Sequence, residues 1–232
     1  MEEILRSGFS DLGIAVSDEA IDMLRRYYQL LDERNKVMNL TAINGEEEVA
    51  RLHFLDCGAL LRFIDLQGKE LLDVGSGAGF PGLVLKILCP SLELTMLDSQ
   101  QKRVTFQQEV AAELGLQGVR SFHGRAEEMT ELRGRFDIVI SRAVAKLDIL
   151  NELCMPQLKV GGRFIAMKGP DPSHEMQEAK RSCYILGGRH VRMEKYTIPG
   201  TDVTHSYIIV IKEFPSPSQY PRRYSSIKKQ PL

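Results

Sequence analysis

“LLDVGSGAGFPGLVLKI”, at residues 71–87, is the stretch that decides the fold. An apolar run ends in Asp73, glycines follow at Gly75, Gly77 and Gly79, and a proline opens a second apolar run. Glycine allows a sharp turn whose backbone amides approach a ligand closely, and proline suits the first turn of a helix. The stretch therefore predicts a strand, a ligand-binding turn and a helix, as in the first unit of a doubly wound sheet.

Two classes of nucleotide-like ligand compete for this turn. Gly77, Gly79 and Gly82 satisfy the GxGxxG fingerprint of dinucleotide sites, and Asp98 follows at the spacing of a ribose-binding acid. Asp73 favours S-adenosyl-L-methionine instead, because its carboxylate would repel the pyrophosphate of NAD and attract an ammonium or sulfonium group. A role limited to capping the turn is the alternative for Asp73.

The ends of the next two predicted strands add candidates for the same site. Asp98 closes “LTMLD” and is placed to accept hydrogen bonds from both ribose hydroxyls, although an aspartate here is equally typical of a helix N-cap. “HGRAEEM” follows the third strand, where the amide of Ala126 would face the adenine edge with Glu127 nearby. Together the three strand ends predict one nucleoside-binding site.

The rest of the chain alternates between β-like and helical runs. From residue 67 to 214 this alternation predicts an α/β fold with a mostly parallel, seven-stranded sheet and helices on both faces. “RHVRMEKYTI” and “SYIIVIKEF” follow one another without a helix, which predicts an antiparallel edge pair. Residues 1–66 are expected to form a helical extension packed on this domain, and residues 215–232 a basic, extended surface tail.

The helical extension is predicted from two amphipathic patterns. Ile21, Leu24, Tyr28 and Leu31 recur at helical spacing after Ser17, a typical N-cap residue. A second helical pattern covers residues 46–64, and His53 within it is interpreted as structural. These helices therefore provide an apolar face for the main domain.

Composition and charge narrow the class of protein. Apolar residues make up 43% and charged residues 26%, which are ordinary globular values. No apolar stretch approaches the roughly 20 residues of a membrane span, and no signal-peptide pattern opens the chain, so we expect a cytoplasmic protein. We also expect it to be a monomer. The four cysteines form no ligand cluster, so we expect no metal. Residues 1–139 carry 15 Lys and Arg against 23 Asp and Glu, and residues 140–232 carry 15 against 8. The second part is therefore better suited to a nucleic acid, with two ordinary solvated surfaces as the alternative.

Several segments together resemble the RsmG (GidB) family of bacterial 16S rRNA methyltransferases. They are “MNLTAI”, “HFLDC”, “DVGSGAGFPGLVLKI”, “MLDSQQKRVTFQQEV”, “FDIVISRAVAKL”, “MKG” and “YPRRYSSIKKQPL”. The resemblance spans nearly the whole chain, and it implies a class I methyltransferase (Rossmann-like) fold. It also implies transfer of a methyl group from S-adenosyl-L-methionine to N7 of one guanosine in 16S rRNA, near the decoding site. The family often has glycine and proline in place of part of “YSSI”, so the loop geometry of the tail is expected to differ.

The resemblance also implies site residues. Gly75, Phe80, Ala126, Glu127 and Arg142 match cofactor-contacting positions of the family. With the residues argued above, the predicted cofactor site comprises Asp73, Gly75, Ser76, Gly77, Gly79, Phe80, Asp98, Ser99, Ala126, Glu127 and Arg142.

The substrate side is predicted from basic residues after later strands. Arg142 is expected to orient the cofactor carboxylate or a substrate phosphate, with a surface salt bridge as the alternative. Lys168 is expected to contact guanine O6 or a phosphate, with a strand-end lysine in water as the alternative. In the tail, an RNA-binding arm is predicted from four cations interleaved with two tyrosines, and a tail without a role is the alternative. The cations are Arg222, Arg223, Lys228 and Lys229, and the tyrosines are Tyr220 and Tyr224.

The chemistry expected of this site needs no catalytic dyad. Guanine N7 carries an in-plane lone pair and no proton, so methyl transfer to it needs no general base. The sequence shows no Asn-Pro-Pro-aromatic motif for exocyclic amines and no paired cysteines for carbon methylation. Positioning would then supply most of the rate, up to about 7–11 kcal/mol. The alternatives that remain are a small-molecule methyltransferase, an NAD-binding module and a non-catalytic RNA-binding protein.

Overall fold

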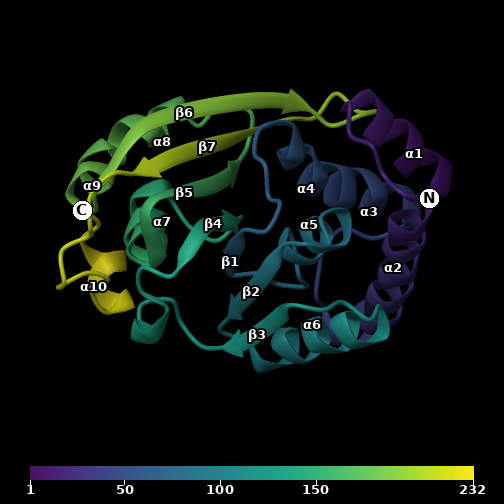
Figure 1. Cartoon of the computed structure of the whole chain (residues 1–232), viewed down its shortest axis with the longest axis horizontal. Helices are drawn as coiled ribbons and strands as arrows, with labels where there is room; N and C mark the ends of the chain where they lie inside the picture. The colour runs from purple at the N-terminus through teal and green to yellow at the C-terminus, as the bar shows by residue number, and fades with distance from the viewer.

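The structure is a computed structural model that describes residues 1–189 and 191–232 (Figure 1). Within this part of the chain, one seven-stranded sheet has the order β3-β2-β1-β4-β5-β7-β6. Its strands are β1 (Glu70–Val74), β2 (Glu93–Asp98), β3 (Val119–His123), β4 (Phe136–Arg142), β5 (Leu158–Lys168), β6 (Gly188–Thr197) and β7 (Thr204–Lys212). Strands β1 to β5 pair in parallel, and β7 runs antiparallel to both β5 and β6. The predicted parallel sheet with an antiparallel pair at its edge is confirmed.

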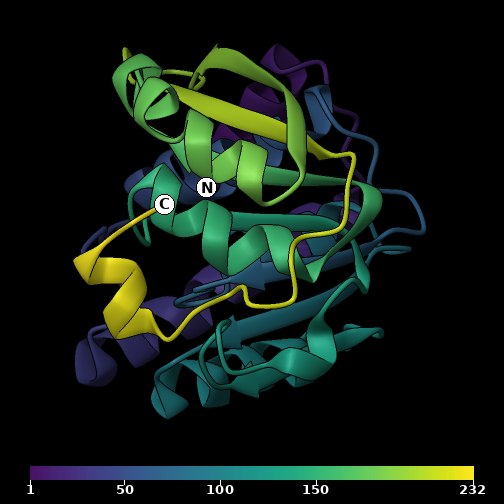
Figure 2. The ribbon, with the colours of Figure 1, turned by 90° about the vertical axis from the view of Figure 1, so that its left-hand side faces the viewer.

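Helices cover both faces of the sheet, as predicted (Figures 1 and 2). The α-helices are α1 (Glu2–Asp11), α2 (Asp18–Met38), α3 (Glu46–Val49), α4 (Asp56–Gly58), α5 (Gly82–Leu88), α6 (Gln101–Glu113), α7 (Leu147–Cys154), α8 (Ser173–Glu178), α9 (Lys180–Ile185) and α10 (Tyr224–Lys229). The other helical segments are η1 (Ala50–Leu55), η2 (Ala59–Arg62), η3 (Thr130–Leu132) and η4 (Met155–Gln157). The helix expected at residues 46–64 is thus four consecutive helical segments.

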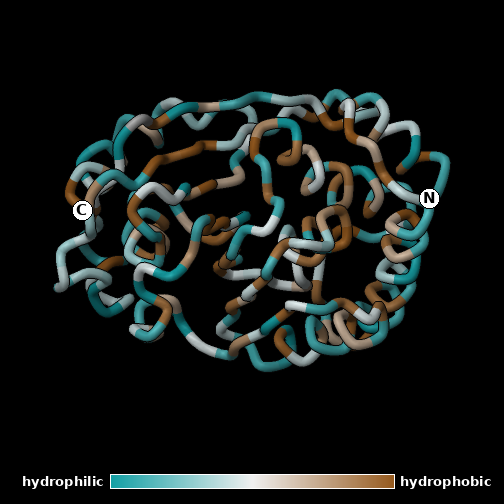
Figure 3. Tube along the Cα trace, in the orientation of Figure 1, coloured by the Kyte–Doolittle hydropathy of each residue, from teal (hydrophilic) through white to brown (hydrophobic). Residues whose placement is uncertain are grey.

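The central strands divide the interior into two apolar layers. Successive residues of a strand point to opposite faces of the sheet. Leu71 and Ile138 join the core that holds the N-terminal helices, α5 and α6, whereas Leu72 and Val139 join the core beneath α7, α9 and α10. Figure 3 shows the corresponding concentration of apolar residues along the inner strands. The N-terminal extension therefore shares its core with one face of the sheet.

Helix α2 connects this extension to the glycine turn. The hydroxyl of Ser17 accepts a hydrogen bond from the Ala20 amide at 3.1 Å, which confirms the predicted N-cap. The side chain that enters the core is Tyr27 rather than the predicted Tyr28, because residue 27 continues the buried stripe of α2. The Tyr27 hydroxyl donates to the carbonyl of Ala78 at 2.5 Å, inside the glycine turn. The extension thus supports the turn directly.

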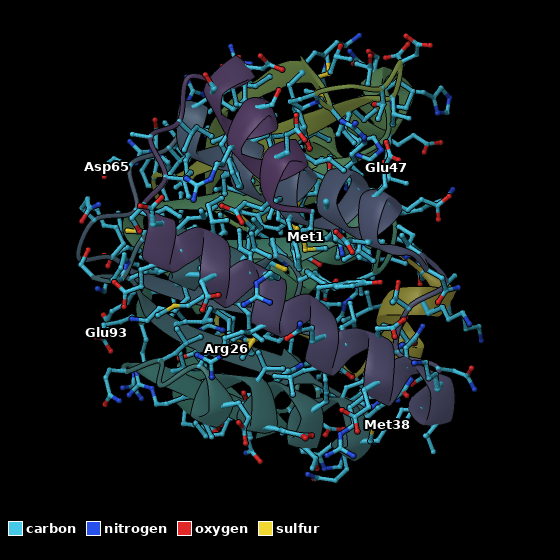
Figure 4. The ribbon with its side chains drawn as sticks, turned by 90° about the vertical axis from the view of Figure 1, so that its right-hand side faces the viewer. Met1, Arg26, Met38, Glu47, Asp65 and Glu93 are labelled. Atoms are coloured by element: carbon cyan, nitrogen blue, oxygen red, sulfur yellow. The ribbon has the colours of Figure 1, made fainter. Side chains whose placement is uncertain are left out.

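Helix α2 also lies along α6, on the side of the molecule seen in Figure 4. The guanidinium of Arg26 donates to the carbonyl of Glu113 at the end of α6, at 2.5 Å. Arg34 pairs with Glu109 one helical turn earlier. These contacts fix α2 against the helix that follows β2.

The C-terminal segment differs from the extended tail that was predicted. After β7 the chain crosses the α7 face of the sheet and ends in α10, as Figure 2 shows in yellow. Ile227 of α10 is fully buried in the core beneath α7. The sequence signal for this helix is weak, because Ile227 is its only buried apolar residue and prolines flank the segment on both sides. Residues 215–232 therefore belong in part to the core.

Candidate active site

A cleft of about 890 Å³ opens at the carboxyl ends of the parallel strands. This is the edge where ligands bind in open α/β sheets. Ten of the predicted site residues line the cleft: Gly75, Ser76, Gly77, Phe80, Asp98, Ser99, Ala126, Glu127, Arg142 and Lys168. Asp73, Gly79 and the four cations of the tail do not line it.

The glycine turn exposes backbone atoms to the cleft at Gly75 and Gly77. Gly75, Gly77 and Gly79 all adopt positive φ, at 76°, 58° and 100°, a region that other residues rarely enter. A Cβ at Gly79 would lie 2.4 Å from a methyl of Leu83, so this glycine is required by packing within the protein. A Cβ at Gly77 would meet no protein atom within 4 Å, so the space beside Gly77 is open to a ligand.

Asp73 lies beneath this turn rather than in the cleft. Its side chain is fully buried, and its Oδ2 accepts a hydrogen bond from the Gly82 amide at 2.9 Å. A Cβ at Gly82 would approach the same oxygen to 2.9 Å, so the start of α5 packs directly on the carboxyl group. This placement corrects the expectation of a direct contact with the cofactor, and it matches the turn-capping alternative.

The second carboxyl oxygen of Asp73 is left without a partner among the described residues. Burial raises the pKa of this carboxyl to about 8, against the hydrogen bond from Gly82 and the charge of Arg142, which lower it. The Asp73 carboxyl is therefore largely protonated at neutral pH, and its negative charge is poorly compensated when it ionises.

Asp98 connects the turn to the helix that follows β2. Its Oδ2 accepts from the Gly77 amide and its Oδ1 from the Gln100 amide, both at 2.9 Å. Arg103 lies 3.5 Å from Oδ2. The N-cap alternative for Asp98 is wrong, because Gln100 is the N-cap residue of α6 and Asp98 bonds backbone amides that precede the helix. The carboxylate still lines the cleft, so it remains available to a ligand.

The loop after β3 forms another wall of the cleft. The carbonyl of Ala126 accepts a hydrogen bond from the Gln157 side chain at 3.1 Å, which fixes the loop against η4. The Glu127 side chain is only 5% exposed, and burial raises its pKa. Glu127 therefore places a largely buried carboxyl group in the cleft lining, where its oxygens can accept a hydrogen bond.

Arg142 stands at the end of β4 and lies across the rim of the cleft. Its guanidinium carbon lies 5.1 Å from the centroid of the Phe80 ring, and its Nη2 lies 3.0 Å from Nδ1 of His53. Nη1 lies 3.4 Å from Oδ2 of Asp56. The side chain is 17% exposed, so Arg142 is an inward-facing group rather than the surface salt bridge of the alternative interpretation.

His53, which the sequence interpretation left out, belongs to this site. A guanidinium has no acceptor atom, so Arg142 donates to Nδ1 of His53, and Nε2 carries the ring proton and donates to the Thr41 hydroxyl at 2.9 Å. Burial, followed by the charge of Arg142, lowers the pKa of His53 to about 3. The ring is therefore neutral, stacks on Phe80 at 4.2 Å, and orients Arg142.

Asp56 is the second residue that the sequence interpretation missed. It is buried, and its Oδ1 accepts from the Tyr196 hydroxyl at 2.6 Å and from Nδ1 of His205 at 2.7 Å. The hydrogen bond to Asp56 raises the pKa of His205, whose ring lines the cleft. Only the motif “HFLDC” could have signalled this network, since its other members come from β4, β6 and β7.

Lys168 is the last residue of β5 and lines the cleft. Its ammonium group donates to the carbonyl of Ala145 at 2.9 Å and to Oε1 of Glu175 at 2.7 Å. The side chain is 13% exposed, so it is not the solvated strand-end lysine of the alternative interpretation. Glu175 also accepts from the Leu147 amide, and this fixes the loop that carries Ala145.

The cations of the predicted RNA arm have different surroundings. Arg222 forms a two-pronged ion pair with Glu152, whose side chain is fully buried, so Arg222 holds the tail in place. Arg223, Lys228 and Lys229 are exposed. The arrangement divides the four cations into one structural residue and three that face solvent.

The described residues lack two features, a membrane-spanning helix and a metal-binding cluster. No helix among the described residues is long and apolar enough to cross a membrane. Within residues 1–189 and 191–232, no group of three or more His, Cys, Asp or Glu side chains is arranged to hold a metal ion.

Solved structures share this fold. Geranyl diphosphate C-methyltransferase from Streptomyces coelicolor A3(2), in complex with Mg²⁺, geranyl diphosphate and S-adenosyl-L-homocysteine, aligns with a TM-score of 0.58 at 15% identity, over 84% of this chain and 98% of that one. M. jannaschii TYW2 in complex with AdoMet aligns with a TM-score of 0.52 at 16% identity, over 64% of this chain and 70% of that one. At these identities the likeness shows the class I methyltransferase fold alone.

Sequence relatives go further. The Ribosomal RNA small subunit methyltransferase G of Alkaliphilus metalliredigens is 43% identical, over 99% of this chain and 98% of the relative. The protein of the same name from Clostridium tetani is 39% identical over the same shares. The sequence profile of the GidB family, described as rRNA small subunit methyltransferase G, matches residues 20–203. The chain therefore belongs to the rRNA small subunit methyltransferase G (GidB) family.

Proposed function

We propose that this chain transfers the methyl group of S-adenosyl-L-methionine to N7 of one guanosine in 16S rRNA, near the decoding site. Membership of the family supplies the reaction class, methyl transfer, and the substrate, small-subunit rRNA. The single observation that carries the proposal is the cleft at the carboxyl ends of the strands, with open space at Gly77 and with Asp98 and Arg142 on its walls.

The residues of the cleft fit this cofactor. The open space beside Gly77 accepts a ligand that approaches the backbone, and the Asp98 carboxylate beside it suits a pair of ribose hydroxyls. Asp73 lies beneath the turn and outside the cleft lining, and its pKa is raised to about 8, so it is largely neutral at pH 7 and adds little charge to the choice of ligand. Ala126 and Glu127 would hold the adenine edge.

The bound cofactor supplies an electrophilic methyl group on a sulfonium. The protein's part is then to place guanine N7 in line with that group and to exclude water. No proton has to leave N7 before the bond forms, so the site needs no general base, and the four cysteines, all buried outside the cleft lining, do not reach it. Arg142 and Lys168 are positioning residues, held inward by His53, Asp56 and Glu175.

The partner that follows is 16S rRNA, either free or in the small subunit or one of its assembly intermediates. A target base inside folded RNA must be exposed to enter the cleft. We propose that the enzyme acts as a monomer, without a metal, in the cytoplasm, where small subunits assemble.

Mass mapping of rRNA from a strain that lacks the gene tests this proposal. We expect one guanosine of 16S rRNA to lose 14 mass units relative to the parent, a difference of one CH₂ group, and the wild-type gene to restore it. Reduction followed by aniline cleavage, which cuts the chain at 7-methylguanosine, assigns the methyl group to N7. An unchanged 16S rRNA would refute the proposed substrate, and a lost methyl group without a change in aniline cleavage would refute N7.

A further inference from the structure

The C-terminal helix reaches the proposed cofactor site through one residue. Tyr224 is the only residue of the tail, within the part of the chain that the structure describes, that lines the cleft. Gly124, Arg125 and Ala126 of the loop after β3 line the same cleft, and Arg125 contacts the Tyr224 ring. The sequence had suggested that this tyrosine stacks on RNA, but its neighbour is the loop proposed to hold the adenine edge.

Tyr224 is held on this wall from two sides. The Arg125 guanidinium carbon lies 5.5 Å from the centroid of the Tyr224 ring, a distance suited to a cation–π contact. The ring is partly buried against the apolar core beneath α7. A ring that is fixed before a ligand binds loses little freedom when it makes a contact.

The segment that carries Tyr224 is itself anchored. Arg222, two residues earlier, bonds the buried carboxylate of Glu152 through its backbone amide and its guanidinium, at 2.6–2.9 Å. Ile227, three residues later, is fully buried. Arg133 of the loop before β4 donates to the carbonyls of Ser216, Pro217 and Tyr220. The tail therefore has a fixed course on both sides of Tyr224.

We propose that Tyr224 forms the outer wall of the adenine pocket and contacts the nucleobase of the cofactor with its ring. The inference rests on the proposed use of S-adenosyl-L-methionine. An aromatic face is the usual partner of a nucleobase, and such contacts tolerate different bases because every base has a π-face. The N-terminus of α10 is thus part of the cofactor site, in addition to the turns that follow β1 to β3.

Binding of S-adenosyl-L-homocysteine and of 5′-methylthioadenosine, measured by titration calorimetry on the full chain, tests this proposal. Methylthioadenosine keeps the nucleoside and lacks the amino-acid part. Tyr224→Leu removes the aromatic ring and keeps apolar packing on α7, so we expect about tenfold weaker binding of both ligands by the same factor. Tyr224→Phe keeps the ring and is expected to bind both like the wild type.

Tyr184→Ala is the matched control. Tyr184 is also a tyrosine stacked by an arginine, with the Arg189 guanidinium carbon 3.9 Å from its ring centroid, but it is 66% exposed and lies outside the cleft. We expect this variant to leave both affinities unchanged. Thermal unfolding of every variant identifies a loss of binding that comes from loss of folding.

Two outcomes would overturn the inference, and they differ from failure of the proposed function. Wild-type affinity in a folded Tyr224→Leu variant would remove the ring from the adenine pocket. A raised KM for RNA without a change in either ligand affinity would assign Tyr224 to the substrate instead. Failure of the wild-type chain to bind either ligand would refute the proposed cofactor, and the inference with it.

Discussion

The guanidinium of Arg142 lies over the ring of Phe80, with 5.1 Å between its carbon and the ring centroid. Phe80 ends the glycine turn after β1, and Arg142 ends β4, the neighbouring strand. His53 contacts both residues. Its ring stacks on Phe80, with 4.2 Å between the ring centroids, and its Nδ1 accepts a hydrogen bond from Arg142. The N-terminal extension thereby sets the position of a side chain that the parallel sheet presents to the cleft.

Arg142→Lys should lower kcat/KM strongly while the protein stays folded. Lysine keeps the charge but cannot stack flat on Phe80 or reach His53 and Asp56 together, so the positioned cation is lost. A misplacement of this kind costs on the order of 100-fold in rate. Methyl incorporation into small-subunit rRNA measures the effect, and Arg25→Lys, in an exposed pair with Asp22, serves as the control. A variant as active as the wild type would remove Arg142 from the positioning role.

Asp98→Ala should weaken cofactor binding by about 1–3 kcal/mol, because a pair of ribose hydroxyls would lose its acceptor. The same carboxylate holds the Gly77 amide at 2.9 Å, so the variant also loosens the turn. Asp98→Asn separates the two effects, since its one carbonyl oxygen can still accept a hydrogen bond from Gly77. Calorimetric titration with S-adenosyl-L-homocysteine provides the affinities, and equal values for all three proteins would exclude Asp98 from the site.

Gly77→Ala should separate binding from stability. The new methyl group meets no protein atom within 4 Å, so the cost to folding is limited to the positive φ of 58°, on the order of 1 kcal/mol. The methyl group stands in the cleft, however, and should prevent close approach of the cofactor to the turn. Gly79→Ala is the contrasting variant, because its Cβ would lie 2.4 Å from a methyl of Leu83 and should destabilise the fold itself. Unchanged cofactor affinity in Gly77→Ala would contradict the placement of the ligand at this turn.

Asp73 predicts how stability depends on pH. Burial raises its pKa to about 8, so between about pH 4 and pH 8 the folded state binds a proton that the unfolded state releases. The contribution of this group to stability is present below pH 4 and is lost as the pH rises through 8. Asp73→Asn keeps an acceptor for the Gly82 amide and does not ionise, so its free energy of unfolding should exceed that of the wild type increasingly from pH 5 to pH 9. Urea unfolding at three pH values tests this, and parallel profiles would contradict the buried, protonated carboxyl.

The sequence predicted what depends on local pattern. The mostly parallel sheet with its antiparallel edge pair, the glycine turn, and Asp98 and Ala126 as cleft residues follow from runs of residues that are continuous in the chain, because parallel strands bring their carboxyl ends to one edge. The network of His53, Asp56 and His205 was not predictable in this way. Its members lie far apart in sequence, and a lone histidine in a helix carries no sign of the arginine that contacts it.

The structure of residues 215–232 was also only partly predictable from the sequence. Its composition predicted a solvated basic arm, but composition does not reveal that Glu152 is buried and needs a cation, or that Ile227 fills the core. A solvated arm could be deleted without loss of the fold. Deleting residues 215–232, however, would leave the Glu152 carboxylate buried without Arg222, so we expect the deletion to destabilise the fold and to remove Tyr224 from the cleft lining.

Neutralising only the exposed cations of the tail is the sharper test of RNA binding. The combined variant Arg223→Gln, Lys228→Gln and Lys229→Gln leaves Arg222 and Ile227 in place, so the fold and the cofactor affinity should be preserved. If these cations neutralise phosphates, RNA affinity falls and its dependence on salt concentration becomes shallower, because fewer counterions are released on binding. Filter binding of small-subunit rRNA over a salt series measures the slope.

The matching control exchanges three exposed cations of α1 and α2, Arg6, Arg25 and Lys36, for glutamine. An equal change of slope in both variants would reflect net charge alone, and an unaltered slope in the tail variant would leave the tail with its structural role only.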